Sequence, residues 1–505
     1  MKPPSRDQEP TSSSGWATDR VMTLGLSESC RRFPLSPSEG ERAGVRGASL
    51  PSGAESASSG PGVLSRRDFL ARGSAVAATS ALAGVSIPWV HAAEDNTIRL
   101  ALIGCGGRGS GAVADAFDSP SGPVKLAVMA DLFPNRLDSA LQVLSEKFKD
   151  RVDVPPDRRF VGFDAYRKAI DCLRPGDVAM LTGYSGFRPA QLEYAVEKGI
   201  NVFMEKSFAP DAPGLRRVMK AGEAAEKKNL KIAAGLQCRH SRNRLELIKR
   251  MRDGELGQIQ LIRAYRMQQV DGLGKRPASE NELFWQIRHF VDFLWVSGGL
   301  FAEMNIHQID ELCWIKDSWP VSAHGIGGRA ANSTDCSQNL DSLSIEWTFS
   351  DGTKALDVVR WLPKCHEEFA TFIHGTKCAA QFSGPHHLGT VQTYKDQHCT
   401  PDNIAWRAPK EPVTPWQAEW TDLLDAIRND KPHNEAKRAA MSNLADLMGR
   451  AAVHTGQLIA WDQMMASNFQ FCPNIDQLTP DSPPPIQADA QGRYPVPVPG
   501  QWTEV

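Results

Sequence analysis

The sequence predicts an α/β protein. An N-terminal Rossmann domain with a doubly wound parallel sheet is expected to precede a C-terminal α/β domain with a large, mainly antiparallel sheet. Apolar strand-like runs alternate with helix-like stretches between residues 97 and 235, as in a parallel sheet. A glycine-rich turn follows the first of these runs. After Gly235, strand-like runs recur with few helical stretches between them, which is typical of an antiparallel sheet.

The elements of the first domain follow a strand–helix rhythm. A strand over 98–103 precedes the glycine turn and a helix over 110–117, and a second apolar run, 124–130, ends at Asp131. The later strands are expected at 177–181, 201–204 and 231–234, with helices at 135–148, 189–198 and 212–228.

The second half has a different pattern. Strands are expected at 259–266, 342–349 and 370–374, and helices at 416–428 and 435–461 should pack back against the domains. From residue 474 the chain is rich in proline, which indicates an extended arm.

Composition narrows the classes of partner. The 505 residues include 57 Lys and Arg against 59 Asp and Glu, interspersed, for a net charge of −2. No basic field is available to bind nucleic acid or an anionic membrane surface, so small neutral molecules suit this balance best. The ten cysteines form neither a CxxC pair nor a Cys/His cluster, and we therefore expect no metal site.

The N-terminal region contains a candidate targeting signal. Residues 65–70, which include Arg66 and Arg67, precede a short, weak apolar stretch over 71–90 and the small residues Ala92 and Ala93. This resembles a twin-arginine export signal and is too short for a membrane span, so we expect export to the periplasm by the twin-arginine machinery. Residues 1–64 show no apolar periodicity and are either a disordered n-region or the product of a start assigned too far upstream.

The expected organisation follows from these patterns. It comprises the n-region 1–64, a signal peptide 65–93, a Rossmann domain 94–235, a substrate and oligomerisation domain 236–465 whose helices return to the Rossmann domain, and a Pro-rich arm 466–505.

The glycine turn has the dinucleotide-binding pattern. Gly104, Gly106 and Gly109 form GxGxxG between a predicted strand and a predicted helix, with Gly107 and Arg108 in the same turn. These glycines permit a tight turn, a close approach of pyrophosphate and close helix–strand packing. Pyrophosphate would then lie at the helix N-terminus.

Asp131 bears on the choice of cofactor. It ends the second strand, where a carboxylate can accept hydrogen bonds from ribose hydroxyls and repel a 2′-phosphate. NAD is therefore favoured. Arg136 lies close in sequence and could offset that repulsion, so NADP stays open.

Two further segments carry candidate chemistry. Glu205 and Lys206 directly follow the strand 201–204, at the carboxyl edge of the sheet where ligands bind. Glu303 and His307 stand four residues apart and share one face of a predicted helix. A carboxylate beside an imidazole raises its basicity, so we expect His307 to have a raised pKa.

The order of these motifs resembles the Gfo/Idh/MocA family of oxidoreductases over residues 97–461. The resemblance implies an open antiparallel sheet that serves substrate binding and homo-oligomer contacts. It also implies that Lys206 hydrogen-bonds the reacting hydroxyl and His307 is the general base, with Glu303 where the family has aspartate and Glu205 beside the cofactor. Further substrate-pocket candidates are Arg239, His240, Tyr265 and Asn305.

One position departs from that family. Its Glu-Lys-Pro is here Glu205-Lys206-Ser207, and a cis bond before serine is disfavoured by about 3 kcal/mol, so we expect Lys206 to be aimed differently.

The favoured function is NAD(P)-dependent hydride transfer on a sugar or polyol. Glycoside cleavage or epimerisation by transient oxidation, and sugar binding without turnover, remain alternatives. Free NAD should be scarce outside the cytoplasm, so an exported enzyme is expected to hold its cofactor tightly.

Overall fold

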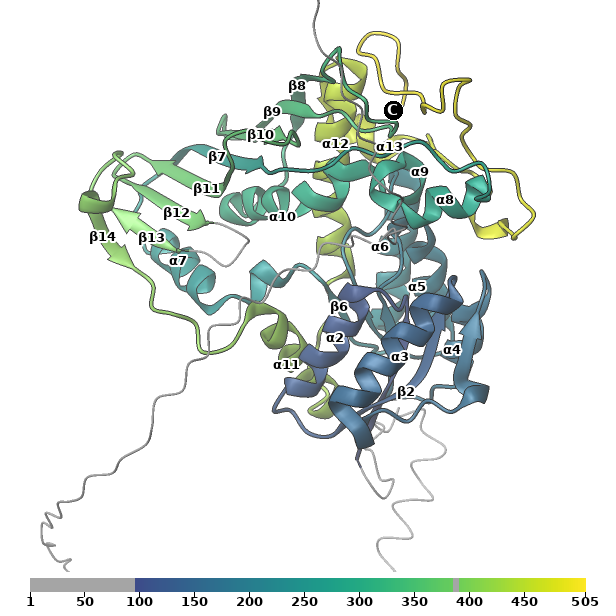
Figure 1. Cartoon of the computed structure of the whole chain (residues 1–505). Helices are drawn as coiled ribbons and strands as arrows, with labels where there is room; N and C mark the ends of the chain where they lie inside the picture. The colour runs from purple at the N-terminus through teal and green to yellow at the C-terminus, as the bar shows by residue number, and fades with distance from the viewer. Residues whose placement is uncertain (1–95, 385–389) are drawn as a thin grey trace, which may run out of the picture. The chain divides into compact units, whose positions relative to one another are not determined.

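The computed structural model describes residues 96–384 and 390–505 (Figure 1). The predicted export signal and n-region lie outside the described residues.

The N-terminal part of the described chain contains a six-stranded parallel sheet. Its strand order is β3-β2-β1-β4-β5-β6, and every neighbouring pair is parallel. The order reverses beside β1, which is where a doubly wound sheet opens a ligand site at its carboxyl edge. The strands are β1 (Ile98–Ile103), β2 (Val124–Asp131), β3 (Arg159–Val161), β4 (Val178–Leu181), β5 (Asn201–Met204) and β6 (Ile232–Ala234).

Both faces of this sheet are covered by helices. Along β1, Ala101 and Ile103 belong to one apolar cluster, whereas Leu100 and Leu102 belong to another. Alternate residues of a strand point to opposite faces, so β1 is buried on both. The helices are α2 (Gly107–Asp118), α3 (Pro134–Phe148), α4 (Ala165–Asp171), α5 (Arg188–Glu197) and α6 (Ala212–Lys227).

The C-terminal part contains a nine-stranded mixed sheet, with the order β14-β13-β12-β11-β7-β10-β9-β8-β15. Only β7 and β10 pair in parallel; the other neighbours whose register is given are antiparallel. The two sheets confirm the predicted fold class. The strands are β7 (Ile259–Met267), β8 (Ser322–Gly328), β9 (Ser342–Thr348), β10 (Lys354–Arg360), β11 (Glu368–Gly375), β12 (Ala379–Ser383), β13 (Gln392–Tyr394), β14 (Ile404–Arg407) and β15 (Ile459–Ala460).

Two long helices connect the sheets. The helix α10 (Gly299–Lys316) packs against β7, and α12 (Ala436–Thr455) packs against α6, α10 and β8 (Figure 1). The predicted helix over 435–461 is too long, because Gly456 adopts φ +70° and ends α12. The remaining helices are α7 (Arg242–Arg252), α8 (Glu282–Arg288), α9 (Leu294–Ser297), α11 (Pro415–Arg428) and α13 (Trp461–Ala466).

The proline-rich C-terminal arm docks on the rest of the chain. The side chain of Gln286 donates to the carbonyl of Ile486 at 2.6 Å, and the backbone N–H of Tyr494 donates to Cys336 at 3.0 Å. The arm brings its penultimate residue, Glu504, into the interior, where it is 1% exposed.

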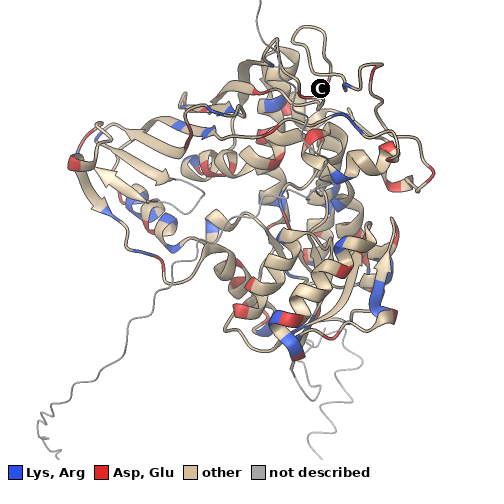
Figure 2. Cartoon of the chain, in the orientation of Figure 1, with Lys and Arg blue, Asp and Glu red and all other residues tan. Residues whose placement is uncertain are grey.

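Charged side chains of both signs are scattered over the described elements (Figure 2). None of the helices between residues 96 and 505 that the structure describes has the length and apolar character needed to cross a bilayer.

Candidate functional site

In the turn after β1, two positions can be occupied only by glycine. Gly104 has φ +101°, and a Cβ there would lie 2.4 Å from the backbone nitrogen of Gly183. A Cβ on Gly109 would lie 2.3 Å from the carbonyl oxygen of Gly104. Both positions therefore exclude any side chain. At Gly106, by contrast, a Cβ would meet nothing within 4 Å, so this stretch of backbone borders open space.

The open glycine stands at the N-terminus of α2. Gly106 is the N-cap, makes no side-chain cap hydrogen bond, and is followed by a first turn without acidic residues. The first N–H groups of a helix lack intrahelical partners, and with the helix dipole they favour an anion. These features fit a pyrophosphate group beside Gly106 and Gly107.

Asp131 is tied to the glycine turn in the structure. Its carboxylate accepts the backbone N–H of Cys105 at 2.6 Å and that of Phe133 at 2.7 Å. Burial raises the pKa of this carboxyl above its ordinary value. Each carboxylate oxygen has a second lone pair, so the predicted contact with a ribose hydroxyl stays open. The side chain of Arg136 donates to the hydroxyl of Tyr184.

An ion pair joins the glycine turn to the loop after β5. Arg108 Nε lies 2.6 Å from Glu205 Oε1, and a second nitrogen of Arg108 lies 3.2 Å from Asp115. The residues Arg108 and Glu205 are far apart in sequence, yet both were predicted to lie at the cofactor. The pair places the Lys206 backbone next to the turn, and the Lys206 N–H donates to the other oxygen of Glu205 at 3.1 Å.

Lys206, which follows β5, contacts Glu303 of α10. Lys206 Nζ donates to the carbonyl oxygen of Glu303 at 2.5 Å and lies 3.1 Å from its carboxylate. Glu303 also accepts from the hydroxyl of Ser185 at 3.4 Å. The peptide bond between Lys206 and Ser207 is cis, which the absence of proline had led us not to expect. The lysine side chain thus reaches the helix that carries the predicted base.

His307 lies one turn further along α10. It is buried, and burial lowers its pKa well below 6.5, assisted by the positive charges of Lys206 and Arg266. The expectation that Glu303 would raise this pKa is wrong, because desolvation and the surrounding cations dominate. The imidazole is therefore neutral at neutral pH and able to accept a proton.

The side chains of the four predicted substrate residues contact residues other than Lys206, Glu303 and His307. Arg239 makes a bidentate pair with Asp310, at 2.9 and 2.8 Å, which occupies its guanidinium inside the fold. His240 contacts the carboxylate of Asp422 at 2.7 Å. Although burial alone would lower the pKa of His240, its acidic neighbours raise it to about 10.

Asn305 and Tyr265 face other parts of the protein. Asn305 is fully buried and donates to Asp357 of β10 at 2.6 Å. On β7, Arg266 donates to the carbonyl of Met304 in α10, so the adjacent Tyr265 points to the opposite face of the sheet. Tyr265 there accepts a hydrogen bond from Arg263 at 2.7 Å. The place of Tyr265 and Asn305 in a substrate pocket stays a prediction.

Three buried residues were not predicted for the site. Arg188, 1% exposed, donates to the carbonyls of Gly183 and Ser207, and burial lowers its pKa to about 10. Ser185 contacts Glu303. Glu419 of α11 is fully buried without a hydrogen bond to its carboxylate in the described part of the chain. Burial, and then the charge of Glu205, raise the pKa of Glu419 well above its usual value.

The helix α12 holds the Lys206 loop and the start of α10 together. Arg450 donates to the carbonyls of Pro210 and Gly298, both at 3.1 Å, and pairs with Glu504 at 3.0 Å. Pro210 ends the loop that contains Lys206, and Gly298 precedes the helix that carries His307. A single buried guanidinium therefore fixes both segments of the candidate site.

The chain is similar in fold to several proteins of known structure. No family model and no curated protein matches the chain. The scyllo-inositol dehydrogenase from Lactobacillus casei, solved with NAD(H) and scyllo-inositol, is 22% identical, with 73% of this chain and 100% of that chain covered and a TM-score of 0.54. The aldose-aldose oxidoreductase from Caulobacter crescentus, complexed with glycerol, is 15% identical, covers 72% and 100%, and has a TM-score of 0.56.

An oxidoreductase from Agrobacterium radiobacter in complex with NAD+, L-tartaric acid and magnesium is 13% identical over 73% of this chain and 99% of that chain, with a TM-score of 0.55. This chain therefore shares the fold of these oxidoreductases, a Rossmann-like domain joined to a domain with a mixed sheet.

Proposed function

We propose that the chain is a nicotinamide-dependent oxidoreductase of the Gfo/Idh/MocA type, which moves hydride between a carbinol carbon of a sugar or polyol and the cofactor. One observation carries this proposal. The open glycine turn and the Lys206–Glu303–His307 group lie next to each other, joined by the Arg108–Glu205 pair. The dinucleotide and the reacting hydroxyl would then share one site. The bound nicotinamide complexes among the structures of similar fold support the choice of cofactor.

The residues present suit a dinucleotide. Gly106 and the N-terminus of α2 would hold pyrophosphate, and Asp131 would accept ribose hydroxyls. When bound, the cofactor supplies the hydride acceptor or donor at its nicotinamide ring. Asp131 favours NAD because its carboxylate repels a 2′-phosphate, and the engagement of Arg136 with Tyr184 supports the same choice.

Residues of the protein would accept and return the proton of the reacting hydroxyl. In the oxidative direction, the neutral imidazole of His307 takes that proton as the carbon loses hydride. Lys206 Nζ is a cation with three donors, and it would stabilise the negative charge that develops on the same oxygen. Glu303 holds Lys206 Nζ at 3.1 Å and so orients the donor. Reduction is the reverse, with His307 returning the proton.

A pair of glycine variants tests cofactor binding without disturbing the fold. Gly106→Val places a Cβ where, its chain neighbours apart, nothing lies within 4 Å, at extended backbone angles that valine adopts readily. The fold should be kept, with a loss of stability of no more than about 2 kcal/mol at this N-cap, while NAD binding, measured by calorimetry, is lost. Gly111→Ala on the same helix has only the flexible Arg108 end at 3.6 Å nearby and should bind NAD normally. Normal NAD binding by Gly106→Val would contradict the placement of the cofactor.

Export and assembly extend the proposal. We propose that the chain reaches the periplasm by the twin-arginine route with its cofactor already loaded and retained. We also propose that copies associate through the face of the nine-stranded sheet that carries Tyr265, which is turned away from α10. Cofactor content after purification from the periplasm, and sedimentation of the purified protein, test the two points separately.

A further inference from the structure

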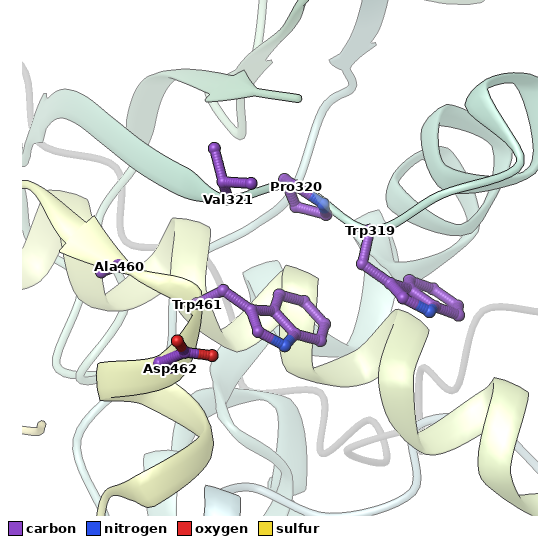
Figure 3. Close-up of a pocket in the computed structure, with 6 residues that line it drawn as sticks. All are labelled: Trp319, Pro320, Val321, Ala460, Trp461 and Asp462. Atoms are coloured by element: carbon purple, nitrogen blue, oxygen red, sulfur yellow. The ribbon is translucent and has the colours of Figure 1, made fainter. Parts of the chain in front are cut away.

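A small surface pocket lies where the chain enters β8 and where α13 begins (Figure 3). It has a volume of about 210 Å³ and is lined by Trp319, Pro320, Val321, Ala460, Trp461 and Asp462. The backbone N–H of Trp461 donates to the carbonyl of Val321 at 3.0 Å, and β15 pairs with β8 directly beside it. The pocket walls are therefore fixed by the sheet rather than by a loose loop.

The pocket is remote from the candidate catalytic group. Trp319 follows the last residue of α10, Lys316, whereas His307 lies nine residues before that end. A helix rises about 1.5 Å per residue, which separates His307 from Lys316 by about 14 Å along the axis. None of the six lining residues takes part in the site described above.

Two of the six lining residues are tryptophans. The rings of Trp319 and Trp461 are nearly parallel, with an interplanar angle of 19° and centroids 6.1 Å apart. Both side chains are half-buried, and Figure 3 shows them side by side. Within the described part of the chain, neither indole N–H has a hydrogen-bond acceptor. Each ring thus offers a flat apolar face and a free donor.

Asp462 adds an acceptor at the edge of this platform. Its side chain is exposed, and it makes no ion pair with any residue that the structure describes. The lining thus combines an apolar flat surface with a carboxylate and two N–H donors, and contains no cation. Such mixed lining suits a ligand with one apolar face and several hydroxyl groups, because the faces stack while the polar groups fix orientation.

We propose that this pocket, the tryptophan platform, is a second saccharide-binding site that takes a neutral sugar ring on the paired indoles with its hydroxyls on Asp462. Parallel rings favour a flat ligand. A quaternary ammonium ion instead suits rings set at an angle around it, which is a cage that these two residues do not form. The platform does not depend on the proposed oxidoreductase function, since it shares no residue with that site.

Direct binding to the full chain tests the proposal. The probes are D-glucose and maltotriose, and their binding is measured by saturation-transfer NMR and calorimetry. Tetramethylammonium is measured in the same way, because it represents the alternative class of ligand. Trp461→Ala and Trp319→Ala should each weaken the platform's sugar binding about tenfold, the equivalent of roughly 1.4 kcal/mol for one stacking contact. Trp406→Ala, at a half-buried tryptophan of β14 outside the platform, should bind as the wild type does.

Asp462→Asn is a variant that should still fold, because the exposed carboxylate of Asp462 makes no hydrogen bond or ion pair among the described residues. It should also weaken sugar binding while the unfolding transition is unchanged. His307→Ala separates the two sites, since sugar bound at the platform should persist in it. Sugar binding indifferent to Trp319, Trp461 and Asp462, or a preference for tetramethylammonium, would overturn the proposal. The proposal would also be overturned if the protein bound no sugar and instead self-associated in a way that the tryptophan variants abolish.

Discussion

Replacing Glu504 with glutamine should destabilise the protein strongly, although the residue is second from the C-terminus. Its carboxylate is 1% exposed and binds Arg450 at 3.0 Å, His454 at 2.9 Å and the indole N–H of Trp502 at 2.8 Å. Arg450 is itself 1% exposed, so glutamine would leave a buried guanidinium without its counter-charge. Removing one partner of a buried pair costs about 3–5 kcal/mol.

The pKa of Glu504 gives a second value for the same interaction. Burial alone would raise the pKa of Glu504, but the charges of Arg450 and His454 outweigh it and lower the pKa from 4.5 to about 2. At about 1.4 kcal/mol per unit, this shift corresponds to roughly 3 kcal/mol. Since the folded-state pKa is depressed, this stabilisation is complete above pH 4.5 and is lost as the pH falls through about 2.

Urea unfolding of the wild type and of Glu504→Gln over this pH range is the assay. The difference in unfolding free energy should be about 3 kcal/mol at neutral pH and should shrink steadily between pH 4.5 and about 2. Asp481→Asn, an exposed position in the same arm, should change stability by less than about 0.5 kcal/mol at every pH. A difference below about 1 kcal/mol for Glu504→Gln, or one that does not change with pH, would show that the buried Glu504–Arg450 pair does not stabilise the fold in this way.

Three substitutions and one pH profile probe the candidate site. His307→Ala should lower turnover by about two to four orders of magnitude with NAD affinity intact, and near-normal turnover would remove His307 as the base. Since burial lowers the pKa of His307 well below 6.5, the wild-type rate should stay level as the pH falls from about 8 to about 6, whereas a rate halved near pH 6.5 would show that burial does not lower the pKa of the base. Lys206→Ala should lower turnover by about 10²–10³-fold without unfolding, and full activity would show that another group stabilises the oxyanion. Gly109→Ala should destabilise the fold, because its Cβ would stand 2.3 Å from the Gly104 carbonyl oxygen; an unchanged melting temperature would show that the turn can relax.

Local features of the site could be predicted from the sequence, because neighbouring residues determine them. The strand over 98–103 and the glycine turn need only a short stretch of chain, and the structure has β1 at those residues. The shared face of Glu303 and His307 follows from helical spacing alone.

Features that depend on distant partners could not be predicted. Arg108 and Glu205 are 97 residues apart, and only the folded chain makes them an ion pair. Tyr265 and Asn305 have suitable chemistry, but which face of a strand or helix meets the site is a tertiary property. Glu419 looks in sequence like an ordinary acidic residue of an amphipathic helix, and only its complete burial distinguishes it.

The proposed hydride transfer is tested most directly by a single-turnover experiment with the purified full chain in excess over the added donor. NAD-loaded protein is mixed with each of a set of sugars and polyols, including D-glucose and myo-inositol, and the absorbance of the reduced nicotinamide ring is followed. At least one donor should reduce the bound cofactor, with about one reduced ring per donor consumed, and His307→Ala should abolish the signal. Protein that binds both NAD and sugar yet gives no reduced ring with any donor would contradict an oxidoreductase and leave a sugar-binding protein without turnover.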